Sequence, residues 1–393
     1  MTLLPGHLDL TEGMNHLESI PSARQTVASH DLGKGIWRLA DPKISLASMA
    51  SIFLGTCAAA AVGPLHFGWL MVTVLGIFAI EVAKNASGEI FDFDSGTDLG
   101  VAPPDRTPFS GGKRVLVDGL LTRRETAVIS LAAYLIGAGA GFWIVAVREP
   151  KILWIGIIGL VCACVYHAPP LRLSYRGLGE LAVAICYGPL IATGTFLVQR
   201  GQVTADILLL SIPLGLLVGA FLWINEFPDC AADKAAGKRT LVVRLGRRHA
   251  SRVFALIIAV AFGWLAALLF FQTPPAASLG FVALWPAANA ARHLWRNPEQ
   301  TRAIVPAQVQ TLLSFVLFAL GTGVGLLLGQ LLTRDHIRHP PDSQAVNPKR
   351  YFSSSPLMPS EARICFDASI PAAVFTMRSN SGLGTSTPSC LMV

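Results

Sequence analysis

LLLSIPLGLLVGAFLWINEFPDCAADKAAGKRT, residues 208–240, passes from an apolar run to three carboxylates and then to a basic loop. The apolar part, residues 208–224, has no polar face for water to cover, which disfavours a surface helix of a soluble protein. With its flanks it is long enough to cross about 30 Å of hydrocarbon as a helix. The stretch therefore predicts a transmembrane helix that ends in an acidic cluster.

The rest of the chain carries the same signal. Its 393 residues are 52% hydrophobic and only 14% charged, with a mean hydropathy of +0.54, which excludes an ordinary soluble globule. Apolar runs of spanning length recur, and we expect nine helices, at residues 44–63, 67–88, 126–147, 152–168, 179–198, 206–224, 250–271, 276–292 and 307–331. The predicted fold is all-α, a polytopic membrane protein with about nine transmembrane helices bundled around a central cavity.

The two ends of the chain differ from the middle. Residues 1–40 lack the apolar segment of a signal peptide and are expected to form a cytoplasmic arm that precedes a transmembrane domain at residues 41–332. Residues 333–393 contain several prolines and a serine-rich stretch, which predicts a disordered tail. The last four residues, beginning at Cys390, have the outline of a prenylation box. We interpret the box as coincidence, because an odd number of spans places the tail outside.

Lysine and arginine are distributed unevenly between the loops. The loops after the second, fourth, sixth and eighth expected spans are rich in them, whereas the outer loops hold only Arg148, Lys151 and Arg200. Because cytoplasmic loops carry the excess of positive charge, the N-terminus and the acidic cluster are expected to face the cytoplasm from an inner (plasma) membrane. The net charge of +7 follows from this topology. The sequence has no nucleic-acid-binding motif, so no nucleic-acid partner is expected.

A further acidic cluster follows the expected span at residues 67–88. Asn85, Glu89 and Asp92 are spaced i, i+4 and i+7, so they share one face of a helix. Asp98 follows a Ser-Gly break and would have to fold back from a loop to join them. Carboxylates are costly beside hydrocarbon, so such a group usually marks a cation or substrate site.

The quoted stretch holds the matching cluster. Asn225, Asp229 and Asp233 are spaced i, i+4 and i+8, again on one face. Mg²⁺ prefers oxygen ligands and is usually held by one or two carboxylates together with substrate phosphates. Two clusters on the same side of the membrane could therefore clamp Mg²⁺ and a diphosphate. The alternative is that each carboxylate merely pairs with an adjacent arginine at a helix end.

Basic and aromatic side chains near the clusters complete the candidate site. The cations expected to neutralise phosphate charge are Arg106, Lys113, Arg114, Lys238 and Arg239. Tyr166 and Tyr175 could hold an allylic cation by cation–π attraction or flank an aromatic acceptor. They could equally be interfacial anchors, which is the commoner role of tyrosine at a membrane surface.

Two motifs carry a resemblance to a known family. Gly88-Glu89-Ile90-Phe91-Asp92, continuing to Asp98, and Asp229-x-x-x-Asp233 resemble the first and second motifs of the UbiA-type intramembrane prenyltransferases. The stretches DRTPFSGGKRVL, YHAPPLRLSYRGLGELA and NEFPDCAADKAAGKRTLVVRLG are most similar to the branch that prenylates 1,4-dihydroxy-2-naphthoate for menaquinone. That branch usually has Asn-Asp where this chain has Gly88-Glu89. The resemblance covers about residues 40–331.

The resemblance implies a Mg²⁺-dependent polyprenyltransferase. It implies that Mg²⁺ is held by Glu89, Asp92, Asp98, Asp229 and Asp233, and that Asp92, Asp229 and Asp233 are catalytic. The candidates for substrate binding are Asn85, Arg106, Lys113, Arg114, Tyr166, Tyr175, Asn225, Lys238 and Arg239. The implied partners are a polyprenyl diphosphate, an aromatic acceptor and the lipid bilayer. With a naphthoate acceptor, the carboxylate would leave as carbon dioxide.

Two alternatives stay open at this point. The acceptor could be another quinone precursor, a chlorophyll-type tetrapyrrole, a glycerol lipid or haem. From a different class of protein, a cation-coupled transporter also uses carboxylates within the membrane. A transporter is expected to hold them near the bilayer midplane with access from both sides. Here they lie at one end of their spans and lead into basic loops, which favours the enzyme.

Overall fold

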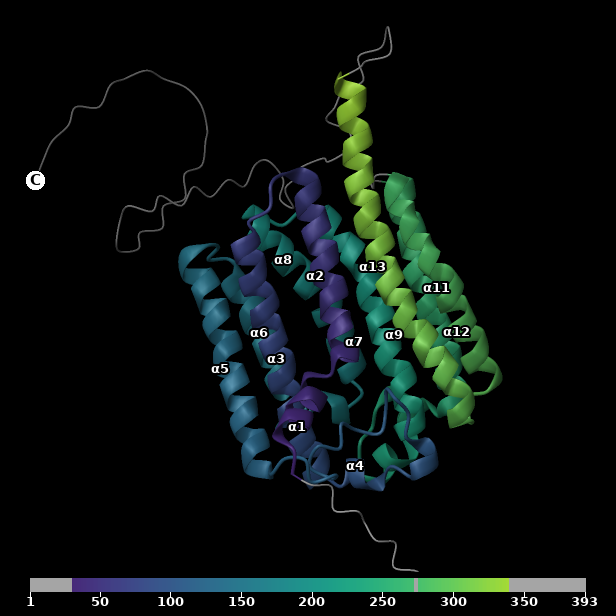
Figure 1. Cartoon of the computed structure of the whole chain (residues 1–393). Coiled ribbons are helices and arrows are strands. Elements are labelled where there is room, and N and C mark those ends of the chain that lie inside the picture. Colours follow the sequence, from purple (N-terminus) through teal and green to yellow (C-terminus); the bar gives the residue numbers. More distant parts are fainter. Residues whose placement is uncertain (1–29, 272–274, 339–393) are drawn as a thin grey trace, which may run out of the picture. The chain divides into compact units, whose positions relative to one another are not determined.

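The computed structural model describes residues 30–271 and 275–338, and every regular element in these two ranges is helical (Figure 1). In chain order the elements are α1 (Leu32–Ala40), α2 (Pro42–Val62), α3 (Phe67–Asp94), α4 (Thr97–Gly100), η1 (Pro103–Asp105), α5 (Arg123–Val147), α6 (Ile152–Val165), η2 (Leu173–Tyr175), α7 (Gly179–Ile185), η3 (Cys186–Leu190), α8 (Ile191–Arg200), α9 (Ala205–Ala235), α10 (Leu241–Leu245), α11 (Arg247–Phe271), η4 (Pro275–Ala283), α12 (Leu284–Arg296) and α13 (Thr301–Arg338). The all-α prediction is confirmed.

Within the described ranges, seven helical segments are long and apolar enough to cross a membrane. They are Leu32–Val62, Phe67–Asp94, Arg123–Val147, Gly179–Arg200, Ala205–Ala235, Arg247–Phe270 and Thr301–Leu332. The protein is therefore an integral membrane protein. The expected count of nine is not confirmed by these criteria, because the span predicted at residues 152–168 forms the 14-residue helix α6 and that at 276–292 is divided between η4 and α12.

The two helices that carry the acidic clusters are longer than their apolar parts. α3 has 28 residues and α9 has 31, which at 1.5 Å per residue gives about 42 and 46 Å. A hydrocarbon core of about 30 Å cannot cover either helix completely. The C-terminal turns of both helices, where the carboxylates lie, can therefore extend beyond the hydrocarbon.

Helix α9 lies at the centre of the main hydrophobic core. Leu214, Leu217, Phe221 and Ile224 lie along this helix and are all buried. The helix packs against α7 and η3 on one side and against α11 and α13 on another. This burial fixes the direction in which α9 presents the polar residues that follow the core positions.

Two glycines bring η3 and α9 together without intervening side chains. A Cβ atom on Gly188 would lie 2.5 Å from the Cα atom of Gly215, closer than real Cβ contacts come. The η3 segment is a π-helical turn that contains Pro189, whose nitrogen cannot donate the regular helical hydrogen bond. The helices therefore meet backbone to backbone at this crossing.

The predictions for the chain ends fall mostly outside the described ranges. Residues 1–29 of the expected arm and residues 339–393 of the expected tail, including the terminal box at Cys390, lie outside them. The part of the arm that is described forms α1, which begins after Asp31; the Asp31 side chain accepts a hydrogen bond from the backbone nitrogen of Lys34. Helix α13 runs to Arg338, beyond the expected domain end at residue 332.

Candidate active site

A cavity of about 740 Å³ lies where the C-terminal turns of α3 and α9 meet the loops that follow them. Most of the residues selected from the sequence line it, namely Asn85, Glu89, Asp92, Asp98, Lys113, Arg114, Tyr166, Asn225, Asp229, Asp233 and Lys238. The two acidic clusters, more than 130 residues apart in the chain, therefore face one space. Their roles in metal and substrate binding stay predictions.

The first cluster is held by backbone groups of the loop between η1 and α5. Glu89 is buried and accepts a hydrogen bond from the Leu116 nitrogen at 2.9 Å. Asp98 reaches the cavity because Gly96 adopts a left-handed φ of 76° and begins the short helix α4. Burial, together with the nearby charges of Asp92 and Glu89, raises the pKa of Asp98 to about 7.

The second cluster lies on about the last three turns of α9. Asp229 Oδ2 accepts a hydrogen bond from the Gly111 nitrogen at 3.1 Å. Asp229 Oδ1 and Glu226 Oε2 are buried and have no hydrogen-bond partner among the described residues. An unpaired buried carboxylate oxygen is costly, so these atoms are free to accept a cation or a donor from a ligand.

The two asparagines of the clusters make contacts that position helices. Asn85 Nδ2 donates to the Leu39 carbonyl of α1 at 2.9 Å. Asn225 Oδ1 accepts from Gln308 Nε2 of α13 at 3.0 Å. Both asparagines line the cavity, but these bonds already tie them to neighbouring helices.

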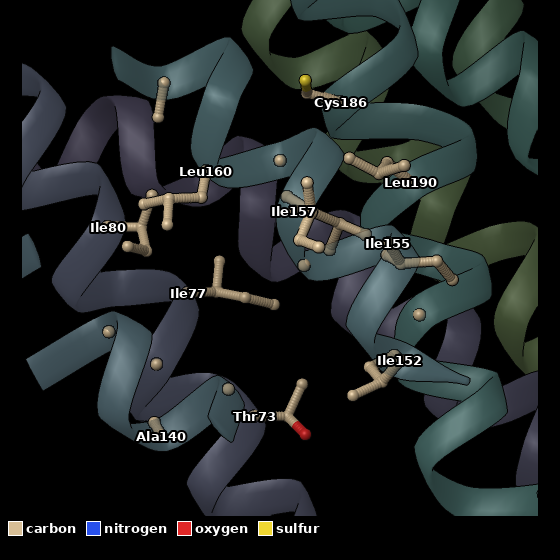
Figure 2. Close-up of a pocket in the computed structure, with 18 of the residues that line it drawn as sticks. Thr73, Ile77, Ile80, Ala140, Ile152, Ile155, Ile157, Leu160, Cys186 and Leu190 are labelled. Atoms are coloured by element: carbon tan, nitrogen blue, oxygen red, sulfur yellow. The ribbon is translucent and has the colours of Figure 1, made fainter. Parts of the chain in front are cut away.

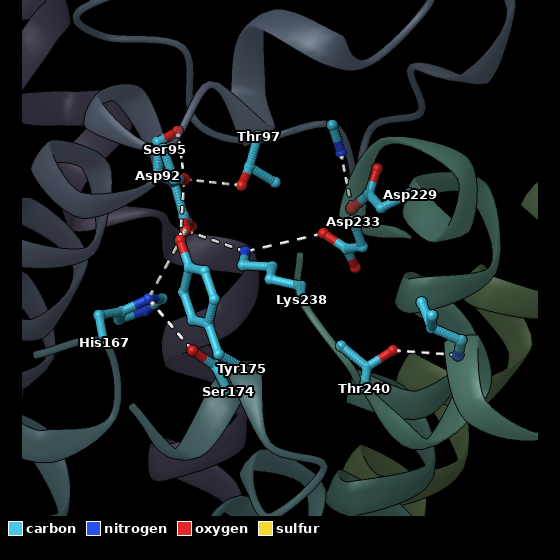
Figure 3. Close-up of polar contacts among 12 residues, drawn as sticks. Asp92, Ser95, Thr97, His167, Ser174, Tyr175, Asp229, Asp233, Lys238 and Thr240 are labelled. Atoms are coloured by element: carbon cyan, nitrogen blue, oxygen red, sulfur yellow. Dashed lines mark hydrogen bonds and ion pairs between the residues drawn. The ribbon is translucent and has the colours of Figure 1, made fainter. Parts of the chain in front are cut away.

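Lys238 joins the two clusters (Figure 3). Its Nζ atom lies 2.9 Å from Asp92 Oδ1 and 3.7 Å from Asp233 Oδ1. Burial alone would lower the pKa of Lys238, but Asp92 and Asp233 together hold the pKa above its ordinary value. The side chain is only 11% exposed, so in this state an internal cation balances the charge between the clusters.

Tyr175 belongs to the same network. Its hydroxyl lies 3.2 Å from Asp92 Oδ1 and 2.8 Å from Ser95 Oγ, and its ring centroid is 5.2 Å from Lys238 Nζ. Burial raises the pKa of Tyr175, and the negative charge of Asp92 raises it further. These contacts place Tyr175 against the acidic cluster, a position that an interfacial anchor would not need.

Gly88 on α3 makes room for a histidine. A Cβ atom on Gly88 would lie 2.7 Å from His167 Nε2, so any larger residue would collide with the imidazole. His167 Nδ1 lies 3.9 Å from Asp92 Oδ1 (Figure 3). Burial lowers the pKa of His167 to about 4, so the ring is neutral at pH 7. His167 therefore occupies the space that a side chain at residue 88 would need.

Two of the basic residues selected from the sequence are not brought to the cavity. Arg106 is exposed and donates to the Val101 carbonyl through both Nε and Nη2 at 3.2 Å. Arg239 is also exposed and does not line the cavity. By contrast Lys113 lines the cavity and pairs with Asp41 at 2.7 Å, and Arg114 lines it and pairs with Asp118 at 3.3 Å.

An apolar cavity of about 490 Å³ adjoins the polar one (Figure 2). Ile77 and Ile80 of α3 lie across from Ile152 and Ile155 of α6, and α5, α7, η3 and α8 contribute further lining. The two cavities share Lys84, Tyr166, Val183 and Tyr187 as lining residues. The site is therefore polar at the ends of α3 and α9 and apolar beside it.

Sequence reasoning missed several polar residues of these cavities. Lys84, His167 and Tyr187 line the polar cavity but were not selected, and Glu226, which also lines it, was counted in the second acidic cluster but given no role in the site. Lys84 and Glu226 are charged residues at the ends of apolar runs, each next to a selected asparagine. That position could have indicated a role for both of them. Nothing in the sequence around His167 or Tyr187 indicates the spatial neighbours that place them there.

The side-chain oxygens of the cavity suit a metal ion that takes some of its ligands from a substrate. In the part of the chain that the structure describes, no three side chains of His, Cys, Asp or Glu converge closely enough to hold a metal ion by themselves. Mg²⁺ seldom requires such a cage, because it keeps waters and takes substrate phosphate oxygens as ligands. The free Asp229 Oδ1 and the facing carboxylates fit Mg²⁺ that arrives with a diphosphate.

Fold and site together define a polytopic α-helical membrane protein with a carboxylate-lined cavity at one end of its helices. Residues 48–312 match the model of the UbiA prenyltransferase family, and the chain belongs to this family. It is therefore an enzyme, a prenyltransferase. The sequence resemblance to this family is confirmed.

Several curated relatives carry the name 1,4-dihydroxy-2-naphthoate octaprenyltransferase. The chain is 27% identical over 243 residues to a 1,4-dihydroxy-2-naphthoate octaprenyltransferase of Bacillus subtilis, covering 61% of this chain and 74% of the relative. It is 28% identical over 292 residues to the protein of that name from Mycobacterium tuberculosis, covering 74% and 96%. Among solved structures, a digeranylgeranylglyceryl phosphate synthase has a TM-score of 0.51 at 13% identity, covering 75% of this chain and 98% of its own. That likeness shows the fold alone.

Proposed function

We propose that this protein transfers a polyprenyl group from a polyprenyl diphosphate to an aromatic acceptor, 1,4-dihydroxy-2-naphthoate, in a Mg²⁺-dependent reaction. The observation that carries the proposal is the single cavity into which both acidic clusters face, next to an apolar cavity. The acceptor is proposed from the names of the curated relatives. The active site is proposed to face the cytoplasm, because the loops beside it are basic.

The polar cavity is proposed to bind the diphosphate. Glu89, Asp92, Asp98, Asp229 and Asp233 would hold Mg²⁺. When bound, Mg²⁺ neutralises the diphosphate and makes it a better leaving group. Lys113, Arg114 and Lys238 line the same cavity and can bind the remaining phosphate oxygens.

The apolar cavity is proposed to receive the prenyl tail. Its isoleucine walls exclude water from the allylic carbon and so protect the developing cation from hydrolysis. The carbon–oxygen bond of the donor breaks and the diphosphate leaves with the electron pair. A ring carbon of the acceptor supplies the pair that forms the new carbon–carbon bond, and with a naphthoate acceptor the ring regains aromaticity by loss of carbon dioxide.

The prenyltransferase is favoured over the other class of protein that the sequence left open. A cation-coupled transporter is not favoured, because the chain belongs to a family of prenyltransferases and its carboxylates lie at one end of α3 and α9. Within the family, another quinone precursor, a tetrapyrrole, a glycerol lipid or haem are alternative acceptors. They are outcomes of the experiment that follows.

The experiment is a transfer assay on the detergent-purified full chain with a radiolabelled polyprenyl diphosphate, Mg²⁺ and a panel of acceptors led by 1,4-dihydroxy-2-naphthoate. We expect a prenylated naphthoquinol that disappears with EDTA. Asp229→Asn is expected to lower the rate about 100-fold or more. Asp206→Asn is the matched control, since Asp206 lies in the first turn of α9, at its other end.

Each result has a distinct meaning. Transfer to a different acceptor would keep the reaction class and discard the naphthoate assignment. Full activity of Asp229→Asn would remove the second cluster from the mechanism. Absence of both transfer and diphosphate release, with every acceptor tested, would contradict the proposed function.

A further inference from the structure

Lys84 lies at the junction of the two cavities and lines both of them. Its Nζ atom sits over the ring of Tyr166, 5.4 Å from the centroid. Within the described ranges this atom has no hydrogen bond and no carboxylate within 4.0 Å. A partly buried ammonium that forms no ion pair with a carboxylate is costly, and such groups in membrane helices usually mark a site of function.

The neighbouring carboxylate does not satisfy Lys84. Glu81 lies one turn earlier on α3, where an i, i+3 pair could form. Instead Glu81 is buried, accepts a hydrogen bond from Ser48 Oγ at 3.0 Å, and makes no ion pair with Lys84. The Lys84 ammonium is therefore available to a ligand in the cavity.

The diphosphate is a poor candidate for that ligand. Lys84 precedes Asp92 by eight residues, which is about 12 Å along the axis of α3. The acidic clusters already have cations beside them, with Lys238 at 2.9 Å from Asp92 and Lys113 in the cavity lining. A diphosphate held by Mg²⁺ at the clusters would use these nearer cations.

The position of Lys84 suits the other substrate. An acceptor ring has to lie between the diphosphate end of the polar cavity and the apolar walls, which is where Tyr166 and Lys84 are. The ring of Tyr166 offers an aromatic face, and the Lys84 ammonium offers a counter-ion to a carboxylate. Both features match an aromatic acid.

We propose that Lys84, beside Tyr166, binds the carboxylate of the aromatic acceptor and so selects carboxylated acceptors over uncharged ones. This inference rests on the proposed function. It makes Lys84 a specificity-determining residue at the junction of the two cavities. An uncharged acceptor of the same shape would leave the ammonium without a partner.

The test compares two acceptors that differ only in the carboxylate, 1,4-dihydroxy-2-naphthoate and 1,4-dihydroxynaphthalene. Lys84→Met keeps the length of the side chain and removes its charge. We expect it to raise KM for the carboxylated acceptor about 10- to 100-fold, the loss typical of a hydrogen bond to a charged group. KM for the prenyl diphosphate and for 1,4-dihydroxynaphthalene is expected to stay within about twofold, and Lys84→Arg to retain the preference for the carboxylate.

A second readout does not depend on catalysis. Binding of 1,4-dihydroxy-2-naphthoate to the full chain, without prenyl diphosphate, is measured by calorimetry for wild type and both variants. Weaker binding by Lys84→Met, with binding retained by Lys84→Arg, supports the inference. Equal binding by wild type and Lys84→Met overturns it even if the wild type proves to transfer no prenyl group. An equal loss with both acceptors, or a raised KM for the diphosphate, also overturns it.

Discussion

Replacing Lys238 by methionine removes the cation that lies between the two acidic clusters. At an effective dielectric constant of about 20, its distances of 2.9 Å to Asp92 and 3.7 Å to Asp233 correspond to Coulombic attractions of about 6 and 4.5 kcal/mol. Desolvation of the buried ammonium offsets much of this attraction. Removing one partner from a buried ion pair typically costs about 3–5 kcal/mol of folding stability. Without Mg²⁺, the variant is therefore expected to unfold at a lower temperature, by roughly 10 °C.

Mg²⁺ is expected to reverse most of that loss. With the ammonium gone, a divalent cation can take its place between the carboxylates without competition, and binding to the folded state alone raises its stability. In the wild type Lys238 competes for the same oxygens, so Mg²⁺ alone is expected to stabilise it less. The assay is thermal unfolding in detergent, followed by tryptophan fluorescence, with EDTA or with excess Mg²⁺.

The control is Lys234→Met, because Lys234 lies on the last turn of α9 but is exposed. It is expected to unfold like the wild type in both conditions. Two results would refute the reasoning. One is a Lys238→Met variant that unfolds with the wild type in EDTA, and the other is an equal Mg²⁺ response in the two proteins.

Two further predictions concern packing and donor length. Gly88→Ala places a Cβ atom 2.7 Å from His167 Nε2 and is expected to destabilise the protein by about 1–3 kcal/mol, the usual range for overpacking. Thermal unfolding of Gly88→Ala, His167→Ala and the double variant checks this. A double variant that is no more stable than Gly88→Ala would contradict the prediction. Ile77→Trp fills the apolar cavity and is expected to lower kcat/KM for long prenyl diphosphates while sparing geranyl diphosphate; an equal effect on both donors would place the tail elsewhere.

Local spacing was sufficient to predict the acidic faces. Glu89 and Asp92 on α3, and Asp229 and Asp233 on α9, are separated by helical intervals, and the structure places all four in one cavity. The same reasoning fails for loops. Arg106 and Arg239 are close to the clusters in sequence, but their side chains are exposed, because loop direction depends on tertiary contacts that spacing does not encode.

Residues brought in from a distance were the hardest to predict. His167, in the loop after α6, lies close to Asp92 of α3 only because Gly88 on α3 leaves room for its ring, and neither His167 nor Gly88 alone carries that signal. The eighth expected span shows a similar limit. Residues 276–292 are apolar enough to predict a span, yet the 3₁₀ segment η4 occupies their first half and α12 only begins at Leu284.

The contact between Gly188 and Gly215 restricts how this enzyme can be altered. Any side chain at either position would force two main chains apart, so the crossing of η3 and α9 tolerates no larger residue. Substitutions that reshape the apolar cavity, the proposed site of the prenyl tail, are therefore expected to be tolerated best at lining residues away from this crossing, such as Ile77 on α3 and Ile157 on α6. Libraries at such positions should yield new chain-length preferences, while libraries on the crossing should yield mostly unfolded protein.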